Sequence, residues 1–314
     1  MSGAVPSRAD VEQAAVRIGS GVRSTPVVEL DPAELDPPAE TPGGRLVLKL
    51  ELLQHTGSFK ARGALNNVLS LAPGTEGVCA ASGGNHGAAV AWAASRAGIR
   101  ADVFAPASST PTKLERIEEY GAVLHRVDGH VGDALDACLE FSRRRGVPLL
   151  HPYDTPATVA GAGTLGLELH EQVPEIDRVV IACGGGGLYA GVAAALPDVD
   201  VQPVEPELCP HLHDALAAGE PVDRVAAGVA ADALGPLSIG RIAFETARAR
   251  GAESLLVPDA AIVAARQFLW QRLRVLAEPA ASVPLAAVMT GAVPVRDGET
   301  VALVISGGNN PATP

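Results

Sequence analysis

Basic residues, aromatic residues and closely spaced cysteines are all scarce in this sequence. The 314 residues carry a formal net charge of −12, and the longest basic run covers only residues 143–145. Because a nucleic-acid binder needs a basic face to neutralise phosphates, no nucleic-acid partner is expected. Aromatic residues make up 3% of the chain and hydrophobic residues 47%, which predicts a folded α/β protein with an aliphatic core.

The cysteine spacing, the N-terminus and the longest uncharged run exclude further classes of protein. The four cysteines stand far apart, which suggests neither a disulfide framework nor a zinc knuckle. The first ten residues lack the apolar segment of a secretory signal, so a cytoplasmic protein is expected. The uncharged run 179–197 is long enough to cross a membrane, but four consecutive glycines would break a spanning helix, and no membrane partner is expected.

Apolar runs of strand length alternate with helix-periodic runs, which is typical of parallel sheets joined by crossover helices. Strands are expected at 45–50, 77–81, 101–105, 122–127, 148–152, 178–183, 199–205, 254–258 and 300–306. Helices are expected near 58–71, 84–97, 111–120, 131–145, 157–172, 187–196, 209–218, 238–250 and 259–276. The second to fifth strands form a compact block with their helices. We therefore expect a large domain of residues 1–72 and 151–314, with a small, mobile domain of residues 73–150 inserted into it.

Four consecutive glycines, 184–187, follow an apolar run and precede a helix-periodic run. When a strand runs through glycines into the start of a helix, free backbone N–H groups and the positive end of the helix dipole point at one place. A phosphate site requires this arrangement. The alternative is a tight strand-to-helix turn, which rarely needs four glycines. A phosphate site is therefore the favoured interpretation.

The segment GAGTLG, residues 161–166, matches the dinucleotide pattern G-x-G-x-x-G by its letters. The residues before it are typical of a helix start rather than of a strand end, and no acidic residue about 20 positions on is placed to hold a ribose. Close helix packing is the favoured interpretation. An NAD-dependent oxidoreductase is the alternative from a different class of enzyme.

Two further glycine-bearing loops follow predicted strands. SGGNHG, residues 82–87, combines backbone amides with the side chains of Ser82 and Asn85, and such a loop can hold a small anion such as a carboxylate. The same residue types are also ordinary helix caps. The segment SGGNN begins at Ser306 and places a hydroxyl at the carboxyl end of the last strand, where parallel-sheet proteins bind ligands.

Only three lysines, Lys49, Lys60 and Lys113, accompany the arginines. A lysine is required where an amine must lose its proton and attack a carbonyl, because a guanidinium stays protonated. Lys113 lies in a charged helical stretch and is expected to be solvated, and Lys49 is expected to pair with Glu51. Lys60 follows Phe59 at a predicted helix start, where an apolar neighbour and the helix dipole both lower an amine's pKa. It is the candidate functional lysine, with a surface cation as the alternative.

The motifs GSFKARGA, SGGNHG, GGGG, AEPAA and SGG occur in this order along the chain. Together they resemble the fold-type II pyridoxal 5′-phosphate (PLP) enzymes, specifically the threonine/serine dehydratase and serine racemase family, from about Thr25 to Asn309. The resemblance implies a tryptophan synthase β-like α/β fold, with two open twisted sheets flanked by helices and a smaller domain inserted in a larger one. It also implies PLP as the cofactor and suggests a homodimer.

The resemblance assigns roles to individual residues. Lys60 would form the Schiff base with PLP and remove the substrate α-proton, with Ser82 as a second catalytic candidate. The substrate carboxylate would be held by Ser82, Gly83, Gly84, Asn85 and His86. The cofactor would be held by Phe59 near the ring, Asn85 at the 3′-oxygen, Gly184, Gly185, Gly186, Gly187 and Leu188 at the phosphate, Gly228 against the ring and Ser306 at the pyridine nitrogen.

The implied reaction is β-elimination from a small hydroxy amino acid such as L-threonine or L-serine, which releases a 2-oxo acid and ammonia. Racemases of the family carry a second serine where this chain has Gly83, so dehydration is favoured over racemisation. A β-hydroxyaspartate-type dehydratase, or another fold-type II lyase or synthase, is the alternative within the family. Substrate specificity is expected to depend on residues around Gly83, His151, Tyr153 and Asp154.

The family's optional divalent-cation site matches this chain at Glu205, whereas an acidic position near its end is His211. Histidines two residues apart on a helix, His211 and His213, point in divergent directions. Two solvated histidines are therefore favoured over a transition-metal site. No metal is expected, and Glu205 is the weak candidate.

Overall fold

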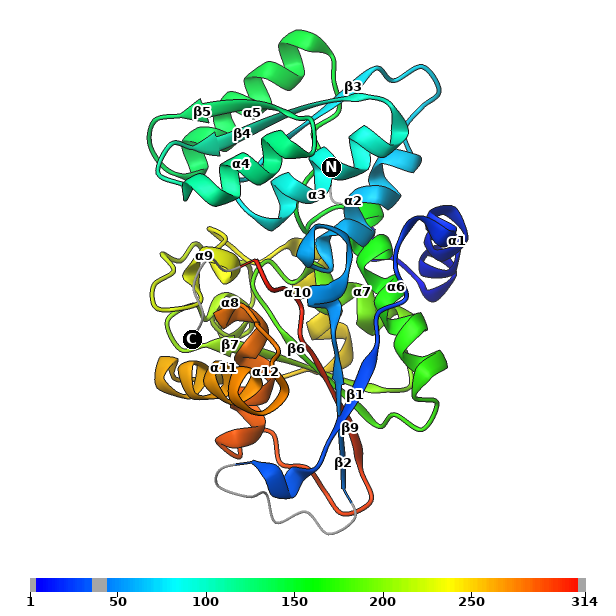
Figure 1. The fold of residues 1–314 in the computed structure, drawn as a ribbon, viewed down its shortest axis with the longest axis vertical. Coiled ribbons are helices and arrows are strands. Elements are labelled where there is room, and N and C mark those ends of the chain that lie inside the picture. The colour runs from blue at the N-terminus through cyan, green and yellow to red at the C-terminus, as the bar shows by residue number, and fades with distance from the viewer. Residues whose placement is uncertain (1–3, 36–43, 310–314) are drawn as a thin grey trace.

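The computed structural model describes residues 4–35 and 44–309, which form two β-sheets with helices around them (Figure 1). The larger sheet has six strands in the order β1-β2-β9-β6-β7-β8, and the smaller has three in the order β3-β4-β5. Strands β1 and β2 pair antiparallel, and the other paired strands in the described residues are parallel. The expected α/β architecture with two open sheets is confirmed.

The elements have the following bounds. The strands are β1 (Val27–Leu30), β2 (Arg45–Lys49), β3 (Gly77–Ala81), β4 (Arg100–Pro106), β5 (Val123–Val127), β6 (Arg178–Ala182), β7 (Asp200–Pro206), β8 (Leu255–Val257) and β9 (Thr300–Val304). The α-helices are α1 (Arg8–Ile18), α2 (Lys60–Leu69), α3 (Asn85–Ala97), α4 (Pro111–Glu119), α5 (Val131–Arg145), α6 (Pro156–Gln172), α7 (Gly187–Ala195), α8 (His211–Ala218), α9 (Ala231–Leu234), α10 (Arg241–Arg250), α11 (Asp259–Leu273) and α12 (Pro279–Met289). Short 3-10 helices span Gly19–Gly21, Pro32–Glu34, Glu51–Leu53 and His55–Gly57.

The six-stranded sheet separates two aliphatic cores. Val179 and Ile181 of β6 face the core formed with α6, α7 and α10. Val180 and Ala182 face the core formed with α11 and α12. Because successive strand residues point to opposite faces, a strand that is apolar throughout is buried on both sides. The carboxyl end of β6 therefore delivers the glycine loop to one edge of a rigid sheet.

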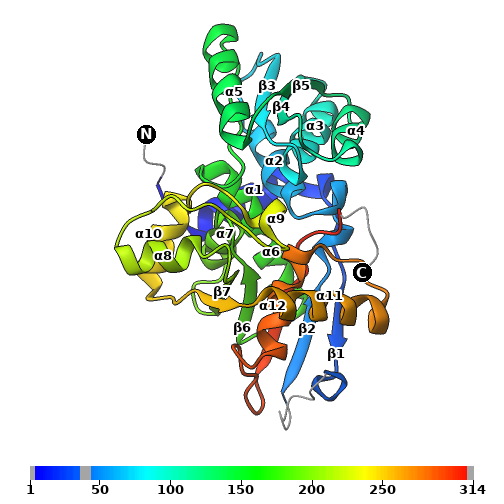
Figure 2. The same cartoon turned by 90° about the vertical axis from the view of Figure 1, so that its left-hand side faces the viewer.

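The three-stranded sheet forms a second unit, above the larger one in Figure 1 and seen from the side in Figure 2. Val78 and Ala80 of β3 pack with α3, and Cys79 packs with α5. Helix α2, which precedes the predicted small domain, contributes Leu65 and Val68 to the same core as Val78. The predicted boundaries of a mobile domain, 73–150, remain a prediction.

The expected strand at 148–152 does not form. This segment makes one parallel bridge, between Cys79 and Leu149. The Cys79 N–H donates to the Pro148 oxygen and the Leu150 N–H donates to the Cys79 oxygen, both at 2.9 Å. Pro148 and Pro152 have no N–H to donate, so the ladder cannot extend further.

Four elements, β1, α1, α9 and α12, are absent from the sequence-based expectations. Helix α1 carries a capping box of Ser7 and Asp10, which is a signal that the sequence contains. Helix α12 is buried along most of its length and includes Pro284. It therefore lacks the alternation of apolar and polar faces by which an amphipathic helix is identified.

The segment GAGTLG lies inside α6 and not at a strand-to-helix turn. A Cβ at Gly163 would lie 2.5 Å from the Gly191 oxygen of α7, and one at Gly161 would lie 2.7 Å from the Cβ of Asn66 of α2. The glycines therefore allow three helix backbones to approach closely, as the helix-packing interpretation predicts. The dinucleotide interpretation, and with it the oxidoreductase alternative, is wrong because these N–H groups lie within a helix.

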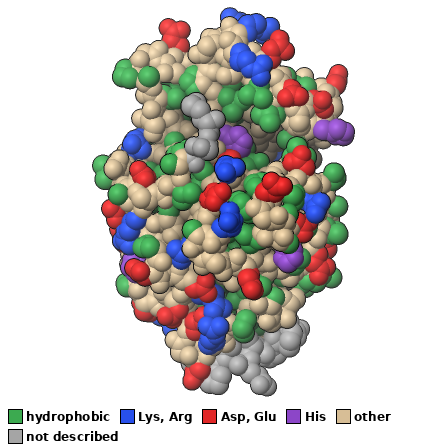
Figure 3. Space-filling model, turned by 180° about the vertical axis from the view of Figure 1, so that it is seen from behind, with side chains coloured by type: hydrophobic (Ala, Val, Ile, Leu, Met, Phe, Trp, Pro, Cys, Tyr) green, Lys and Arg blue, Asp and Glu red, His purple; other side chains and the backbone are tan. Residues whose placement is uncertain are grey.

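The uncharged run 179–197 is divided among β6, the glycine loop and α7. Within residues 4–35 and 44–309, no helix is both long enough and apolar enough to span a membrane. On the face shown in Figure 3, the described acidic and basic side chains are interspersed and form no basic patch.

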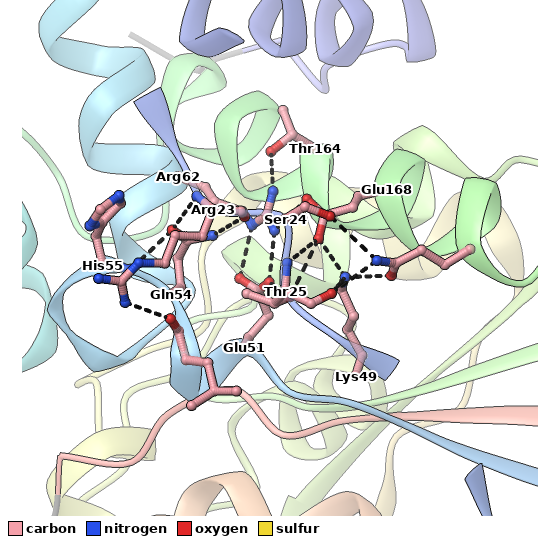
Figure 4. A network of polar contacts seen from close by, with 12 residues as sticks. Arg23, Ser24, Thr25, Lys49, Glu51, Gln54, His55, Arg62, Thr164 and Glu168 are labelled. Atoms are coloured by element: carbon pink, nitrogen blue, oxygen red, sulfur yellow. Dashed lines mark hydrogen bonds and ion pairs between the residues drawn. The ribbon is translucent and has the colours of Figure 1, made fainter. Parts of the chain in front are cut away.

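A buried network of charged side chains joins β2, α2 and α6 (Figure 4). Arg62 donates from Nε and Nη2 to the two oxygens of Glu51 at 2.8 and 2.7 Å, and from Nη2 to Glu168 at 2.8 Å. Lys49 pairs with Glu168 and not with Glu51, so the expected Lys49–Glu51 pair is wrong. Burial alone would raise the pKa of Glu168, but the charges of Arg62 and Lys49 outweigh this effect and lower it. The network fixes the start of α2, where Lys60 lies.

Candidate functional site

A cavity of about 250 Å³ lies between the two units, at the carboxyl ends of β6 and β9. It brings together almost all of the predicted site residues from both sheets and from α2. They are Phe59, Lys60, Ser82, Gly83, Gly84, Asn85, His86, Gly184, Gly185, Gly186, Gly187, Leu188 and Ser306. Parallel-sheet proteins bind ligands at this kind of edge.

Lys60 is the first residue of α2 and lines this cavity. Its Nζ donates a hydrogen bond to the Pro152 oxygen at 2.7 Å and lies 5.0 Å from the centre of the Phe59 ring. Burial lowers the pKa of Lys60 to about 8. About a tenth of this amine is therefore neutral at pH 7, and the neutral amine is the form that acts as a nucleophile or a base.

The loop between β6 and α7 presents unpaired backbone donors. Within the described part of the chain, the N–H groups of residues 184–187 have no hydrogen-bond acceptor. Gly186 has a φ of +79°, which residues other than glycine rarely adopt, and a Cβ at Gly187 would lie 2.7 Å from the Tyr153 oxygen. Helix α7 starts at Gly187, so its positive end is directed at the same point. The loop is built to hold an anion such as a phosphate.

The 82–87 loop joins β3 to α3 and is the second candidate anion site. Ser82 Oγ accepts a hydrogen bond from the Gly84 N–H at 3.2 Å, and α3 begins at Asn85. The buried His86 ring lies with Nε2 2.8 Å from the Leu150 oxygen. Burial, together with the Lys60 charge, lowers the pKa of His86 to about 3, so the imidazole is neutral. The imidazole therefore adds no positive charge to this loop, where the start of α3 contributes positive potential.

Asn85 is held by two residues from the other end of the chain. Its Nδ2 donates to both oxygens of Glu278 at 3.0 Å, and its Oδ1 accepts from Asn309 Nδ2 at 2.7 Å. Burial raises the pKa of Glu278, which also lines the cavity. Glu278 is not among the predicted site residues, although it belongs to the AEPAA motif. The Ser306 hydroxyl lines the same cavity and bonds to no residue in 4–35 or 44–309.

Gly228 is a predicted site residue that the structure does not bring to the cavity. It is exposed, with a φ of +82°, and a Cβ there would lie 2.5 Å from the Asp259 carboxylate. Gly228 is therefore not part of the cavity lining that the other predicted site residues share.

Glu205 is buried beneath α8, away from the cavity. Its two oxygens accept from the N–H groups of Leu212 and His213 at 2.8 Å each, and one also accepts from Ser254 Oγ at 2.6 Å. Burial raises the pKa of Glu205 to about 7. Glu205 thus caps a helix, and residues 4–35 and 44–309 contain no cluster of three His, Cys, Asp or Glu side chains suited to a metal.

His211 differs from its prediction as a solvated histidine. It is fully buried, and its Nδ1 lies 3.1 Å from the Cys209 oxygen. Leu212 and Ala215, one and four residues further on, share its buried face, and this helical spacing is the signal in the sequence for its burial.

Lys113 also differs from its prediction, because it lines the cavity and is only 16% exposed. It forms an ion pair across the cavity with Asp232 of α9. The charged stretch that contains Lys113 suggests solvation, but this lysine lies on the side of α4 that faces the larger unit.

Of the residues predicted to set substrate specificity, Gly83 and Tyr153 line the cavity. His151 instead accepts hydrogen bonds from the N–H groups of Tyr153 and Asp154.

Comparison with known proteins agrees with this geometry. The profile of the family described as "Pyridoxal-phosphate dependent enzyme" matches residues 18–307. The chain is 37% identical to the L-threonine ammonia-lyase of Thermotoga maritima, over 86% of this chain and 69% of that protein. It is 34% identical to the phenylserine dehydratase of Ralstonia pickettii, over 94% of this chain and 91% of that protein.

A solved structure shares the fold. The crystal structure of a T.th. threonine deaminase superposes with a TM-score of 0.89 at 34% identity, covering 98% of this chain and 100% of that chain. The family profile and these identities together mean that the chain belongs to the pyridoxal-phosphate-dependent enzyme family.

Proposed function

We propose that this protein is a PLP-dependent ammonia-lyase that converts a hydroxy amino acid, such as L-threonine or L-serine, to a 2-oxo acid and ammonia. The observation that carries the proposal is the Lys60 amine in a cavity that is also lined by two candidate anion sites, the glycine-bearing loops 184–187 and 82–87 at helix starts. One site suits the phosphate of PLP and the other suits the carboxylate of an amino acid. The relatives named above act on threonine and phenylserine, which both carry a β-hydroxyl.

The residues present fit PLP. The unpaired N–H groups of 184–187 and Leu188 would hold its phosphate, and the unpaired Ser306 hydroxyl would meet its ring nitrogen. Phe59 would lie beside the ring and Asn85 at the 3′-oxygen. When bound, PLP supplies an electron-accepting ring that stabilises negative charge at the substrate α-carbon. A hydroxyl beside the ring nitrogen adds no charge there, in contrast to a carboxylate.

The protein residues then act in a defined order. Lys60 would hold the cofactor through its amine, and it would be free to act on the substrate once an amino acid is bound. The N–H groups of the 82–87 loop and the Ser82 hydroxyl hold the substrate carboxylate and orient the α-C–H bond. The Lys60 amine, whose pKa is lowered by burial, removes the α-proton as a general base. The β-hydroxyl would leave as water, taking up one proton for the one that Lys60 removes, and Gly83 supplies no side chain to return a proton to the α-carbon from the opposite face.

Replacing Lys60 tests the assignment directly. Lys60→Ala should abolish 2-oxo acid release from L-threonine and remove the visible absorbance of the bound cofactor. Lys60→Arg is the matched control, because it keeps the positive charge but cannot attack a carbonyl. It should be equally inactive, and substantial turnover by either variant would refute the role of Lys60.

Substrate choice among the family alternatives can be measured in one assay. The 2-oxo acid released from L-threonine, L-serine and 3-hydroxyaspartate should be compared at equal enzyme concentration. We expect L-threonine and L-serine, whose side chains are uncharged, to react faster than 3-hydroxyaspartate. Lys113, which also lines the cavity, is already paired with Asp232 and is not free to bind a side-chain carboxylate. A preference for 3-hydroxyaspartate would favour the β-hydroxyaspartate-type dehydratase.

We further propose that residues 73–150 move as a small domain, that the chain forms a homodimer and that it acts in the cytoplasm. The first proposal is supported by the separate three-stranded sheet, and the other two by the resemblance and the composition described above. Sedimentation equilibrium at micromolar concentration tests the dimer, and cell fractionation tests the location.

A further inference from the structure

Gly83 leaves a space in the 82–87 loop that another residue fills. An ideal Cβ at Gly83 would lie 2.0 Å from the Oγ of Ser109 and 2.8 Å from its Cβ. Ser109 lies in the turn between β4 and α4, and both residues line the cavity. A side chain on residue 83 and the side chain of Ser109 therefore exclude each other. The position that a residue-83 side chain would occupy carries a hydroxyl from a different segment.

The Ser109 backbone is held in a turn, and its hydroxyl has no hydrogen-bond partner among the described residues. The Ser109 N–H donates to the Pro106 oxygen at 3.0 Å, which fixes the turn. Across the described ranges 4–35 and 44–309, its Oγ makes no hydrogen bond. A serine hydroxyl offers one donor and two acceptor lone pairs, and half-buried polar groups are stabilised by finding a partner. The cavity is where that partner would bind.

We infer that Ser109 is a substrate-binding residue, whose hydroxyl donates a hydrogen bond to the substrate α-carboxylate held at the 82–87 loop. The inference rests on the proposed function and deepens it. The loop approaches the carboxylate from the start of α3, and Ser109 approaches it from the start of α4.

The surroundings favour a hydrogen-bond donor over a second base. No carboxylate or imidazole within the described residues hydrogen-bonds to the Ser109 hydroxyl, so no neighbouring base is placed to accept its proton. An unactivated hydroxyl binds a carboxylate well, because hydrogen bonds to charged groups are the stronger ones. We therefore expect the Ser109 hydroxyl to tighten binding of the amino acid, compared with a variant that lacks it, and to cause no racemisation.

Single substitutions at neighbouring serines test whether the hydroxyl matters. Ser109→Ala should raise the KM for L-threonine about tenfold or more, with a smaller effect on kcat. It should also raise the Kd for L-alanine, which has the carboxylate but no leaving group, measured from the visible absorbance change. Ser108→Ala is the matched control, because Ser108 is exposed and lies outside the cavity lining, and it should change neither value. Unaltered cofactor absorbance in each variant shows that the site is intact.

Two double variants distinguish the effect of the hydroxyl from the effect of side-chain volume. Gly83→Ser with Ser109→Gly returns a hydroxyl to the same space from the loop itself, whereas Gly83→Ala with Ser109→Gly returns only carbon. The first double variant should bind L-alanine close to the wild-type Kd, and the second should bind it as weakly as Ser109→Ala. Equal Kd values in the two double variants would overturn the role of Ser109 but leave the proposed function standing. An unchanged KM and Kd in Ser109→Ala would have the same consequence. A wild-type holoenzyme that is inactive on every hydroxy amino acid would overturn the proposed function, and the inference with it.

Discussion

At the scale of residues, the site is distinguished by groups that lack partners. Lys49 pairs with Glu168 and Lys113 pairs with Asp232, whereas Lys60 has no ion-pair partner among the described residues and donates only to a carbonyl oxygen. An ammonium without a counter-ion is destabilised by burial, so its proton is released more readily. The same burial makes the amine reactive toward a carbonyl.

The lowered pKa of Lys60 predicts how the cofactor-free protein takes up PLP. Only the neutral amine attacks the carbonyl, and its fraction rises about tenfold per pH unit below a pKa of about 8. The rate of uptake should therefore rise with pH and level off above about pH 8. The rate can be followed by the growth of visible absorbance from about pH 6 to about pH 9.5. A pH-independent rate over this range would contradict the lowered pKa.

At the scale of elements, the position of Lys60 depends on how closely α2, α6 and α7 approach. The approach is set by glycines on α6 and α7 and by the buried network of Arg62, Glu51 and Glu168. Both features lie outside the cavity. Their loss should therefore reduce stability first and activity only through misplacement of α2.

Gly163→Ala tests the close approach of α6 and α7. The added Cβ would lie 2.5 Å from the Gly191 oxygen, and overpacking of this kind costs about 1–3 kcal/mol or more. The thermal unfolding midpoint should fall clearly. Gly132→Ala is the control, because its Cβ would meet no atom within 4 Å in α5, and it should be neutral or slightly stabilising. Equal midpoints for the two variants would refute the packing role of Gly163.

Arg62→Met tests the buried network. The substitution leaves Glu51 without its bidentate partner, and an unpaired buried charge costs about 3–5 kcal/mol. Arg8→Met is the control, because the Arg8–Glu12 pair is exposed and should contribute less than about 1 kcal/mol. Both values follow from urea unfolding curves. A loss below about 1 kcal/mol for Arg62→Met would mean that the network contributes little to stability.

At the scale of the whole molecule, the cavity is assembled from two units that meet across it. The smaller unit brings the 82–87 loop, Ser109 and Lys113, and the larger brings the glycine loop, Ser306 and Asp232. The Lys113–Asp232 ion pair is a direct charge contact between them at the cavity wall. We therefore expect this pair to set how much positive charge a substrate side chain meets.

Asp232→Asn should shift substrate preference toward a dicarboxylic amino acid. The change leaves Lys113 as an unpaired cation in the cavity wall, where it can attract a second carboxylate. We expect the ratio of kcat/KM for 3-hydroxyaspartate over L-threonine to rise about tenfold, or ~1.4 kcal/mol. Asp198→Asn is the control, because Asp198 is exposed and outside the cavity lining, and it should leave the ratio unchanged. An unchanged ratio in Asp232→Asn would exclude Lys113 from substrate selection.

The elements that the sequence predicts well are those whose pattern is local. Helix α5 is expected at 131–145 and spans Val131–Arg145, because it is amphipathic and ends at a glycine. Helix α12 escapes prediction because it is surrounded by apolar neighbours and shows no polar face. The apolar residues of the segment 148–152 predict a strand, but its prolines prevent a ladder.

The sequence by itself determined the motif order, the α/β class and the identity of the candidate lysine, because glycine loops, strand runs and a scarce residue type are local features. Only the tertiary structure decided which groups meet. It placed Lys113 and Glu278 in the cavity, His211 in the interior and Gly228 outside the cavity, and it brought Ser109 into the space beside Gly83. These contacts join segments far apart in the chain, so they depend on how the two sheets pack together and leave no local pattern in the sequence.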